Sequence, residues 1–183
     1  SLNDAFDQIK SITGIPDILV NNGGVMVSKW ATETDATTFD RIFNTNIRGA
    51  YFMSQRFAKD LIAENKTGSI INISSASAQR ASIKLSAYCA SKAALLQLTK
   101  AHALEWGPHD IRVNCILPGY IESEINHDFV HSEIGRKFQK QLLRKRFGTP
   151  KHLEGALLLL ASDAGDFITG AELLIDDGQT LKL

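Results

Sequence analysis

Four short apolar runs, separated by longer stretches with helical spacing, constrain the fold of this chain most strongly. The runs are 17–20 (DILV), 69–74 (SIINIS), 111–116 (IRVNCI) and 171–175 (AELLI). Strands that alternate with helices form βα units, and such units build a parallel sheet. The runs are too apolar for a sheet with one face in water, so we expect helices on both faces. The sequence therefore predicts an α/β fold.

Two long helices are predicted between these strands. Apolar residues recur at helical spacing from Asp35 to about Glu64, as in a helix with one buried face. Residues 86–106 form a second such stretch, which is followed by the helix-ending pair Gly107 and Pro108. We therefore expect one long helix in each interval.

The C-terminal third is less regular. The third strand, at 111–116, is expected to stop before Pro118 and Gly119, and residues 120–149 are polar, with a basic helix-like piece at 136–147. A further helix should follow, with Thr149 as its N-cap and Pro150 at its first position.

Length and charge narrow the class of protein. A chain of 183 residues can form a substantial core, and we expect residues 1–183 to be a single domain. Its 20 basic and 20 acidic side chains cancel, which argues against nucleic acid or an anionic membrane as a partner. No apolar run approaches the roughly 20 residues that cross a bilayer, and the N-terminus SLNDAFDQIK lacks a signal-peptide pattern. We expect a cytoplasmic location.

Tyr88 and Lys92 are the first candidate functional pair. They stand four residues apart in SAYCASKAAL, so both lie on one face of the predicted helix. An ammonium beside a phenol favours the phenolate, which would lower the pKa of the tyrosine and make it a general acid and base. Taken alone, the spacing also fits a tyrosine and a snorkelling lysine at a helix rim.

Ser75 and Asn46 favour the catalytic interpretation. Ser75 closes SIINISS at the sheet edge where α/β proteins bind ligands, and its hydroxyl can donate to a substrate carbonyl. Asn46 lies inside the first long helix, where asparagine has poor propensity. We expect a polar kink there that holds a water molecule.

Together these motifs resemble the short-chain dehydrogenase/reductase family. The matching segments follow the family's order and spacing over nearly the whole chain: DILVNNGG, Asn46, SIINISS, SAYCASKAAL, IRVNCILPGYIES and FITGAELLIDDG. The resemblance implies a Rossmann-like parallel sheet flanked by helices. It also implies an oxidoreductase that moves hydride between NAD or NADP and a small-molecule carbonyl or alcohol. The choice between NAD and NADP, the substrate and the direction of reaction stay open.

The resemblance assigns a catalytic role to four residues. Tyr88 would be the proton donor and acceptor. Lys92 would lower the pKa of Tyr88 and hold the nicotinamide ribose. Ser75 would polarise the substrate oxygen, and Asn46 would anchor a proton-relay water.

Further residues match the family's cofactor-binding segments, in addition to Tyr88 and Lys92. They are Asn21, Asn22 and Gly23 in the turn that braces the sheet beside the adenine-side ribose, and Pro118, Gly119, Ile121 and Ser123 in the segment against the nicotinamide carboxamide. Gly23 stands where the family usually has alanine, which loosens a tight turn. Asp177 replaces a glycine, and we expect little functional effect from that change.

The most consequential departure is at the start of the chain. The family begins with a strand and a Gly-rich turn that binds the pyrophosphate, and the sequence contains no such turn. Aligned by its motifs, the chain enters just before the family's fourth strand, so we expect a sheet that is incomplete at its N-terminal side with 17–20 at an open edge. Three explanations stay open: a portion of a longer enzyme, a fragment that pairs its edge with a partner or itself, or a non-catalytic oligomerising or binding protein.

The resemblance also implies self-association. In the family, the helices that correspond to 36–64 and 86–106 form the usual dimer contact as a four-helix bundle. We therefore expect a homodimer or homotetramer, whether or not the chain is catalytic.

His127 and His131 are also four residues apart. No acidic helix motif or third ligand accompanies them in the sequence, so we predict no metal site. The nearby basic run 136–146 is most simply the solvated face of a mobile segment over the substrate cleft. Alternatively, it helps to attract an acidic substrate.

Overall fold

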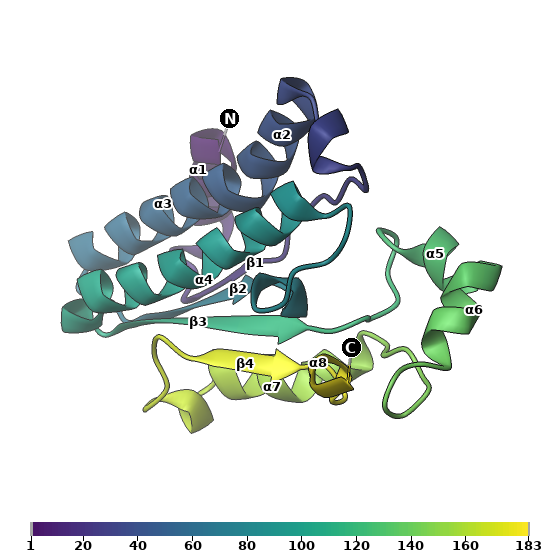
Figure 1. Ribbon diagram of the computed structural model, residues 1–183. Coiled ribbons are helices and arrows are strands. Elements are labelled where there is room, and N and C mark those ends of the chain that lie inside the picture. The colour runs from purple at the N-terminus through teal and green to yellow at the C-terminus, as the bar shows by residue number, and fades with distance from the viewer. Residues whose placement is uncertain (1, 183) are drawn as a thin grey trace.

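Four parallel strands form the centre of the computed structural model, which describes residues 2–182 (Figure 1). The strands are β1 (Ile18–Asn21), β2 (Gly68–Ile73), β3 (Ile111–Pro118) and β4 (Glu172–Ile175). They lie in the order β1-β2-β3-β4, and each neighbouring pair is parallel. The predicted α/β fold with a Rossmann-like parallel sheet is confirmed.

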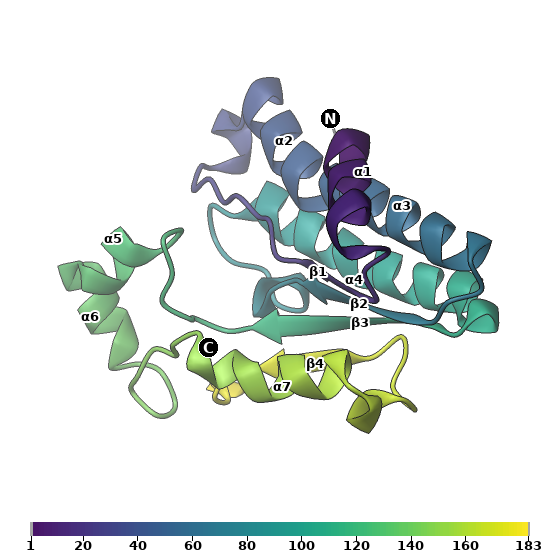
Figure 2. The same ribbon diagram turned by 180° about the vertical axis from the view of Figure 1, so that it is seen from behind.

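Helices pack on both faces of this sheet. α3 (Ala50–Ala63) and α4 (Ser86–Trp106) lie on one face and α7 (Lys151–Ala161) on the other (Figures 1 and 2). The shorter helices are α1 (Leu2–Thr13), α2 (Ala36–Phe43), α5 (His127–His131), α6 (Glu133–Gln139) and α8 (Gln179–Lys182). Helical turns of three residues lie at Ala31–Glu33, Ala76–Ala78, Gly107–His109 and Asp163–Gly165. None of the helices among residues 2–182 is long and apolar enough to cross a membrane.

The first long helix is present, but it is not uniform. The Asp35 carboxylate caps it by accepting a 2.7 Å hydrogen bond from the Thr38 amide. A π-helical segment, Asn44–Gly49, then joins α2 to α3. Such segments are short and often lie at functional sites. Because this one contains Asn46, the irregularity lies where the sequence predicts a kink.

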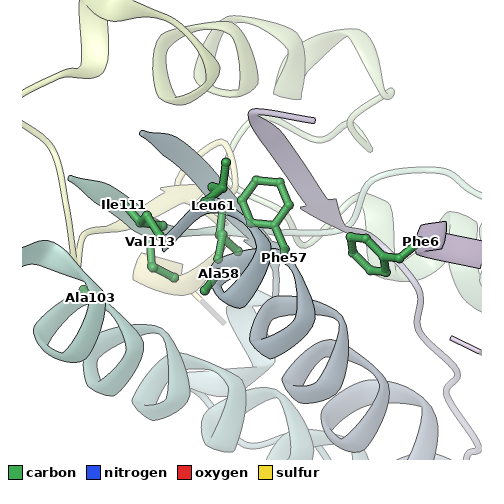
Figure 3. Close-up of a cluster of buried hydrophobic side chains, with 8 residues drawn as sticks. Phe6, Phe57, Ala58, Leu61, Ala103, Ile111 and Val113 are labelled. Carbon is green, nitrogen blue, oxygen red and sulfur yellow. The ribbon is translucent and has the colours of Figure 1, made fainter. Parts of the chain in front are cut away.

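The main core lies between the sheet and the α3 and α4 helices. Phe57 and Leu61 of α3 are fully buried against Ile111 and Val113 of β3 (Figure 3). Successive strand residues point to opposite faces. Ile71 accordingly packs in a second cluster, with side chains of β3 and α7.

The two edge strands are less completely covered by helices than we expected. Both faces are covered at the central strands, whereas Ile18 and Val20 of β1 are 41% and 38% exposed and Leu174 of β4 is 37% exposed. β1 has a single pairing neighbour, β2, among the described residues. It therefore forms the expected open edge, with part of its apolar surface uncovered.

Three boundaries differ from the predictions. β3 continues through Pro118, which pairs with Ile175 as the last residue of the strand. Pro150, rather than Thr149, is the N-cap of α7, and the Thr149 amide donates instead to Nδ1 of His152 at 2.9 Å. The basic piece predicted at 136–147 is helical only as far as Gln139.

Candidate active site

Ser75 and Tyr88 meet beyond the carboxyl end of β2. Ser75 follows β2 by two residues, and its Oγ accepts a 3.1 Å hydrogen bond from the Ser77 amide. Tyr88 lies in the first turn of α4, and its side chain lies near enough to that of Ser75 for Ser75 to influence its pKa. The structure therefore brings together two of the predicted catalytic residues.

The acidity of Tyr88 corrects the sequence prediction. Burial raises the pKa of Tyr88 above 10.0, and the neighbouring Ser75 side chain opposes this rise. The raised pKa is contrary to the lowered value that we expected. The Lys92 Nζ lies 5.8 Å from the centre of the Tyr88 ring and donates a 2.9 Å hydrogen bond to the Ile73 carbonyl.

Lys92 is a buried cation with unused hydrogen-bonding capacity. Its residue is 4% exposed, and burial lowers the pKa of Lys92 from 10.5 to about 8. An ammonium has three N–H donors, and the Ile73 carbonyl takes one of them. A Cβ at Gly24 would lie 3.4 Å from Nζ, so the glycine leaves open space beside the ammonium.

Asn46 joins the segment after β1 to α4. Its Oδ1 accepts from the Val25 amide at 2.8 Å, and its Nδ2 donates to the Val25 carbonyl at 3.0 Å and to the Ser91 Oγ at 2.9 Å. Both amide hydrogens are thus engaged with protein groups, and Asn46 is buried. The side chain therefore fixes the neighbouring backbone within the π-helical segment.

Asn21 braces the sheet at the end of β1. Its Nδ2 donates to the Ser54 Oγ at 2.9 Å and to the Asn72 Oδ1 at 2.8 Å, which connects β1 to α3 and β2. Asn22 and Gly23 follow in the turn, and the Asn22 amide donates to the Val20 carbonyl. A Cβ at Gly23 would meet nothing within 4 Å.

The segment after β3 leaves the same edge of the sheet. Gly119 packs so tightly that a Cβ there would lie 2.5 Å from the Gln179 Oε1. Ile121 forms an isolated parallel bridge with Gly148, and the Ser123 amide donates to the Asn126 Oδ1 at 2.9 Å. Pro118 therefore ends β3, and Gly119, Ile121 and Ser123 follow its carboxyl end, as Ser75 follows that of β2.

Aromatic packing holds the segment 120–149 together. The Tyr120 ring lies 4.7 Å from Phe138, 6.1 Å from Phe129 and 6.2 Å from Phe147, centre to centre. These rings come from the loop after β3, from α5, from α6 and from the loop before α7. They give a segment with little regular structure a core of its own.

Asp177 ties the basic end of this segment to the turn after β4. Its carboxylate accepts from Arg144 at 2.8 Å and from Arg146 at 2.8 and 3.1 Å. The two guanidinium groups, Arg146 first, lower the pKa of Asp177 below 3.8. This part of the run 136–146 is therefore held by ion pairs rather than freely solvated, and Asp177 has a structural partner that the sequence did not suggest.

A third polar group accompanies the two histidines. Glu122 Oε1 lies 2.7 Å from the His131 Nε2 and 3.6 Å from the His127 Nδ1, and one ligand atom from each residue falls within 4.8 Å of the others. The statement that no third ligand accompanies His127 and His131 is therefore wrong. Residues 123–126 form a turn that carries Glu122 back over α5, which the spacing of five residues did not indicate.

Ser91 and Gly24 are site residues that the sequence did not single out. The Ser91 Oγ accepts from Asn46 and donates to the Tyr88 carbonyl at 2.7 Å. A serine inside a long apolar helix was the available signal for its role, and a second glycine in NNGG was the signal for Gly24.

Comparison with known proteins gives extensive matches. A family model described as Enoyl-(Acyl carrier protein) reductase matches residues 1–180. The NAD-dependent glycerol dehydrogenase of Listeria innocua is 35% identical over 96% of this chain and 68% of its own length. The 2-dehydro-3-deoxy-D-gluconate 5-dehydrogenase of Dickeya dadantii is 34% identical over 90% of this chain and 66% of its own length. The chain thus spans about two thirds of these relatives.

A solved structure of a dehydrogenase is also similar to this chain. The gluconate 5-dehydrogenase of Burkholderia cenocepacia, in complex with NADP and tartrate, superposes with a TM-score of 0.94 at 31% identity. The match covers 100% of this chain and 71% of the other. The arrangement of strands and helices described above is therefore shared with a dehydrogenase.

Proposed function

Because this chain belongs to the short-chain dehydrogenase/reductase family, we propose that it carries the catalytic residues of an NAD(P)(H)-dependent oxidoreductase. The substrate would be a small-molecule carbonyl or alcohol. The relatives are named for glycerol and for a gluconate derivative, so polyhydroxylated compounds are the class to test first. The names mention both NAD and NADP, and we assign no preference.

The proximity of the Ser75 and Tyr88 side chains carries this proposal. Two neighbouring hydroxyl groups at the carboxyl edge of a sheet can bond together to one substrate oxygen. In a reduction, the Tyr88 hydroxyl gives its proton to the developing alkoxide, while Ser75 donates a hydrogen bond to the same oxygen. In the reverse direction, Tyr88 accepts the proton of the alcohol. Burial keeps Tyr88 protonated at neutral pH, which is the form required of the acid.

The surroundings of Lys92 fit the nicotinamide side of a cofactor. Two ammonium N–H groups remain for ribose hydroxyls once the Ile73 carbonyl is satisfied. Gly24 leaves open the space that a Cβ would occupy beside Nζ. When bound, the nicotinamide supplies or accepts the hydride. Asn21 to Gly23 and Pro118 to Ser123 would line the remainder of this side.

Asn46 contributes through the backbone in this proposal. A π-helical turn leaves a main-chain carbonyl without its ordinary helical partner. With the amide side chain engaged by Val25 and Ser91, a relay water would bond to such a carbonyl in Asn44–Gly49. The side chain of Asn46 then positions that turn against α4.

The non-catalytic alternative has less support, because the relatives are named as dehydrogenases.

Self-association is part of either proposal. Apolar side chains on the two long helical stretches are exposed, with Tyr51 and Phe52 at 39% and Leu104 at 81%. We propose that these helices form a homodimer or homotetramer. Analytical ultracentrifugation tests this, since a Leu104→Glu variant should shift the wild-type oligomer toward monomer.

Fluorescence titration with NADH and NADPH, followed by assays with glycerol and sugar alcohols, tests the function. Tyr88→Phe should reduce turnover by about 10²–10⁴-fold while cofactor affinity stays nearly unchanged. Lys92→Met should weaken both turnover and cofactor binding. Tyr51→Phe, a change of the same chemistry outside the site, should behave as the wild type. Undiminished turnover in Tyr88→Phe would contradict the assigned mechanism, and failure of the wild type to bind either cofactor would remove the proposed activity.

A further inference from the structure

Glu122, His127 and His131 form a cluster that the proposed oxidoreductase chemistry does not use. His127 and His131 are the first and last residues of α5, and their ring centres are 4.4 Å apart. Glu122 approaches both rings through the same oxygen, Oε1. We propose that these three side chains form a binding site for a divalent transition metal ion, with Zn²⁺ as the representative ligand.

The distances are close to those that a metal requires. Zinc binds imidazole nitrogen and carboxylate oxygen at about 2.0–2.2 Å, so two ligand atoms of a tetrahedral site are roughly 3.4 Å apart. The observed separations of 2.7 and 3.6 Å from Glu122 Oε1 lie on either side of that value. Small rotations of exposed side chains would bring all three atoms to one ion.

Hydrogen bonds to the backbone hold the segment that carries the three ligands in place before any ion binds. Asn126 closes the turn between Glu122 and α5, with its Nδ2 donating to the Ile121 carbonyl at 2.8 Å and its Oδ1 accepting from Ser123. The Glu122 amide donates to the Gly148 carbonyl at 2.9 Å. The cost of ordering the ligand segment is therefore reduced.

The donor set selects the class of metal. Two imidazoles and one carboxylate suit zinc and its neighbours, whereas magnesium and calcium prefer oxygen ligands. Arg136 is a cation near the site, and its Nη1 donates to the His131 carbonyl at 2.9 Å. Its charge opposes that of a metal ion. Together with the exposure of both histidines, this predicts moderate affinity.

Occupancy would have a structural consequence for the segment 120–149. A metal ion would cross-link Glu122, next to the Ile121 bridge with Gly148, to both ends of α5. It would thereby stabilise the folded form of this segment.

Isothermal titration of tag-free protein with Zn²⁺ tests the site without depending on catalysis. The wild type should bind one Zn²⁺, and Mg²⁺ at the same concentrations should give no binding. His127→Ala, His131→Ala and Glu122→Gln should each weaken Zn²⁺ binding by about tenfold or more, because loss of even an outer partner typically costs 10–100-fold. Circular dichroism confirms that each variant is folded.

His109→Ala is the matched control, because it removes an exposed histidine at the opposite end of β3. It should leave Zn²⁺ affinity unchanged. The proposal is overturned if the wild type binds no Zn²⁺, if folded His127→Ala and His131→Ala proteins bind it as tightly as the wild type, or if His109→Ala weakens binding equally. None of these results bears on whether the protein binds NADH.

Discussion

The Asn46 Nδ2 donates a 2.9 Å hydrogen bond to the Ser91 Oγ, which links the π-helical segment to α4. Ser91 in turn donates a 2.7 Å hydrogen bond to the Tyr88 carbonyl, so Asn46 is connected to the backbone at Tyr88. Because Asn46 and Ser91 are both at most 1% exposed, water cannot readily replace either partner. The position of the candidate acid therefore depends on a helix from a different part of the chain.

Replacement of Ser91 by alanine should measure this link. The change leaves one N–H of Asn46 unpaired in the interior, and we expect a loss of about 1–3 kcal/mol in the free energy of unfolding. Gln97→Ala, at an exposed position of the same helix, should change it by no more than about 0.5 kcal/mol. Urea denaturation supplies both values. A double mutant with Asn46→Ala should show a coupling of about 0.5–3 kcal/mol, and strictly additive effects would contradict the link.

Two glycines should respond in opposite directions to alanine. The φ angle of Gly23 lies outside the left-handed region and a Cβ meets nothing within 4 Å, so Gly23→Ala should stabilise the protein by about 0.4–1 kcal/mol through the unfolded state. At Gly119, a Cβ would lie 2.5 Å from the Gln179 Oε1 and 2.8 Å from the Asp176 Cα. Gly119→Ala should destabilise by about 1–3 kcal/mol. Thermal denaturation compares the two, and a loss of stability in Gly23→Ala would show that the turn requires glycine.

Local sequence signals were sufficient for much of the fold. α4 begins and ends at Ser86 and Trp106 as predicted, because an apolar helical pattern and the pair Gly107-Pro108 define it without tertiary information. The strands were found within one or two residues for the same reason. Ser75 and Tyr88 could be expected to meet, since both flank the carboxyl end of one strand.

Contacts made by side chains across the fold could not be predicted in this way. The direction of the Lys92 ammonium depends on the Ile73 carbonyl from β2, and the pKa of Tyr88 is raised mainly by burial. Helical spacing alone indicates neither. Glu122 joins His127 and His131 only because a turn reverses the chain between them. Asp177 matched a turn pattern, and its pairing with Arg146 depends on the path of the segment 120–149.

The Asp177 ion pairs should protect the loop that contains Arg144 and Arg146 from proteolysis. Asp177→Asn removes the charge, and asparagine still tolerates the observed φ of 56°. Asp177→Gly removes the carboxylate and suits this φ still better. We expect trypsin to cleave after Arg144, Lys145 and Arg146 severalfold faster in both variants. Cleavage after Lys10, far along the chain, is the internal reference, and wild-type cleavage rates in both variants would show that the ion pairs do not hold the loop.

His102 should make stability depend on pH. Its residue is 3% exposed, its ring stacks on Trp106 at 4.0 Å, and its Nδ1 is a buried atom without a hydrogen-bond partner among the described residues. Burial lowers the pKa of His102 from 6.5 to about 4. The unfolded chain therefore binds a proton at a higher pH than the folded protein does, so stability is lost as the pH falls from 6.5 toward 4.

His102→Phe isolates this effect, because phenylalanine keeps the stacking and cannot be protonated. The free energy of unfolding of the wild type should fall relative to that of the variant by up to about 3 kcal/mol between pH 7 and pH 4, at 1.36 kcal/mol per pKa unit. Urea denaturation at intervals of pH measures the difference between the two proteins, in which the titration of all other groups cancels. Parallel curves over this range would mean that His102 is protonated equally in the folded and unfolded states, and a difference that grows as the pH falls would locate the proton uptake at this ring.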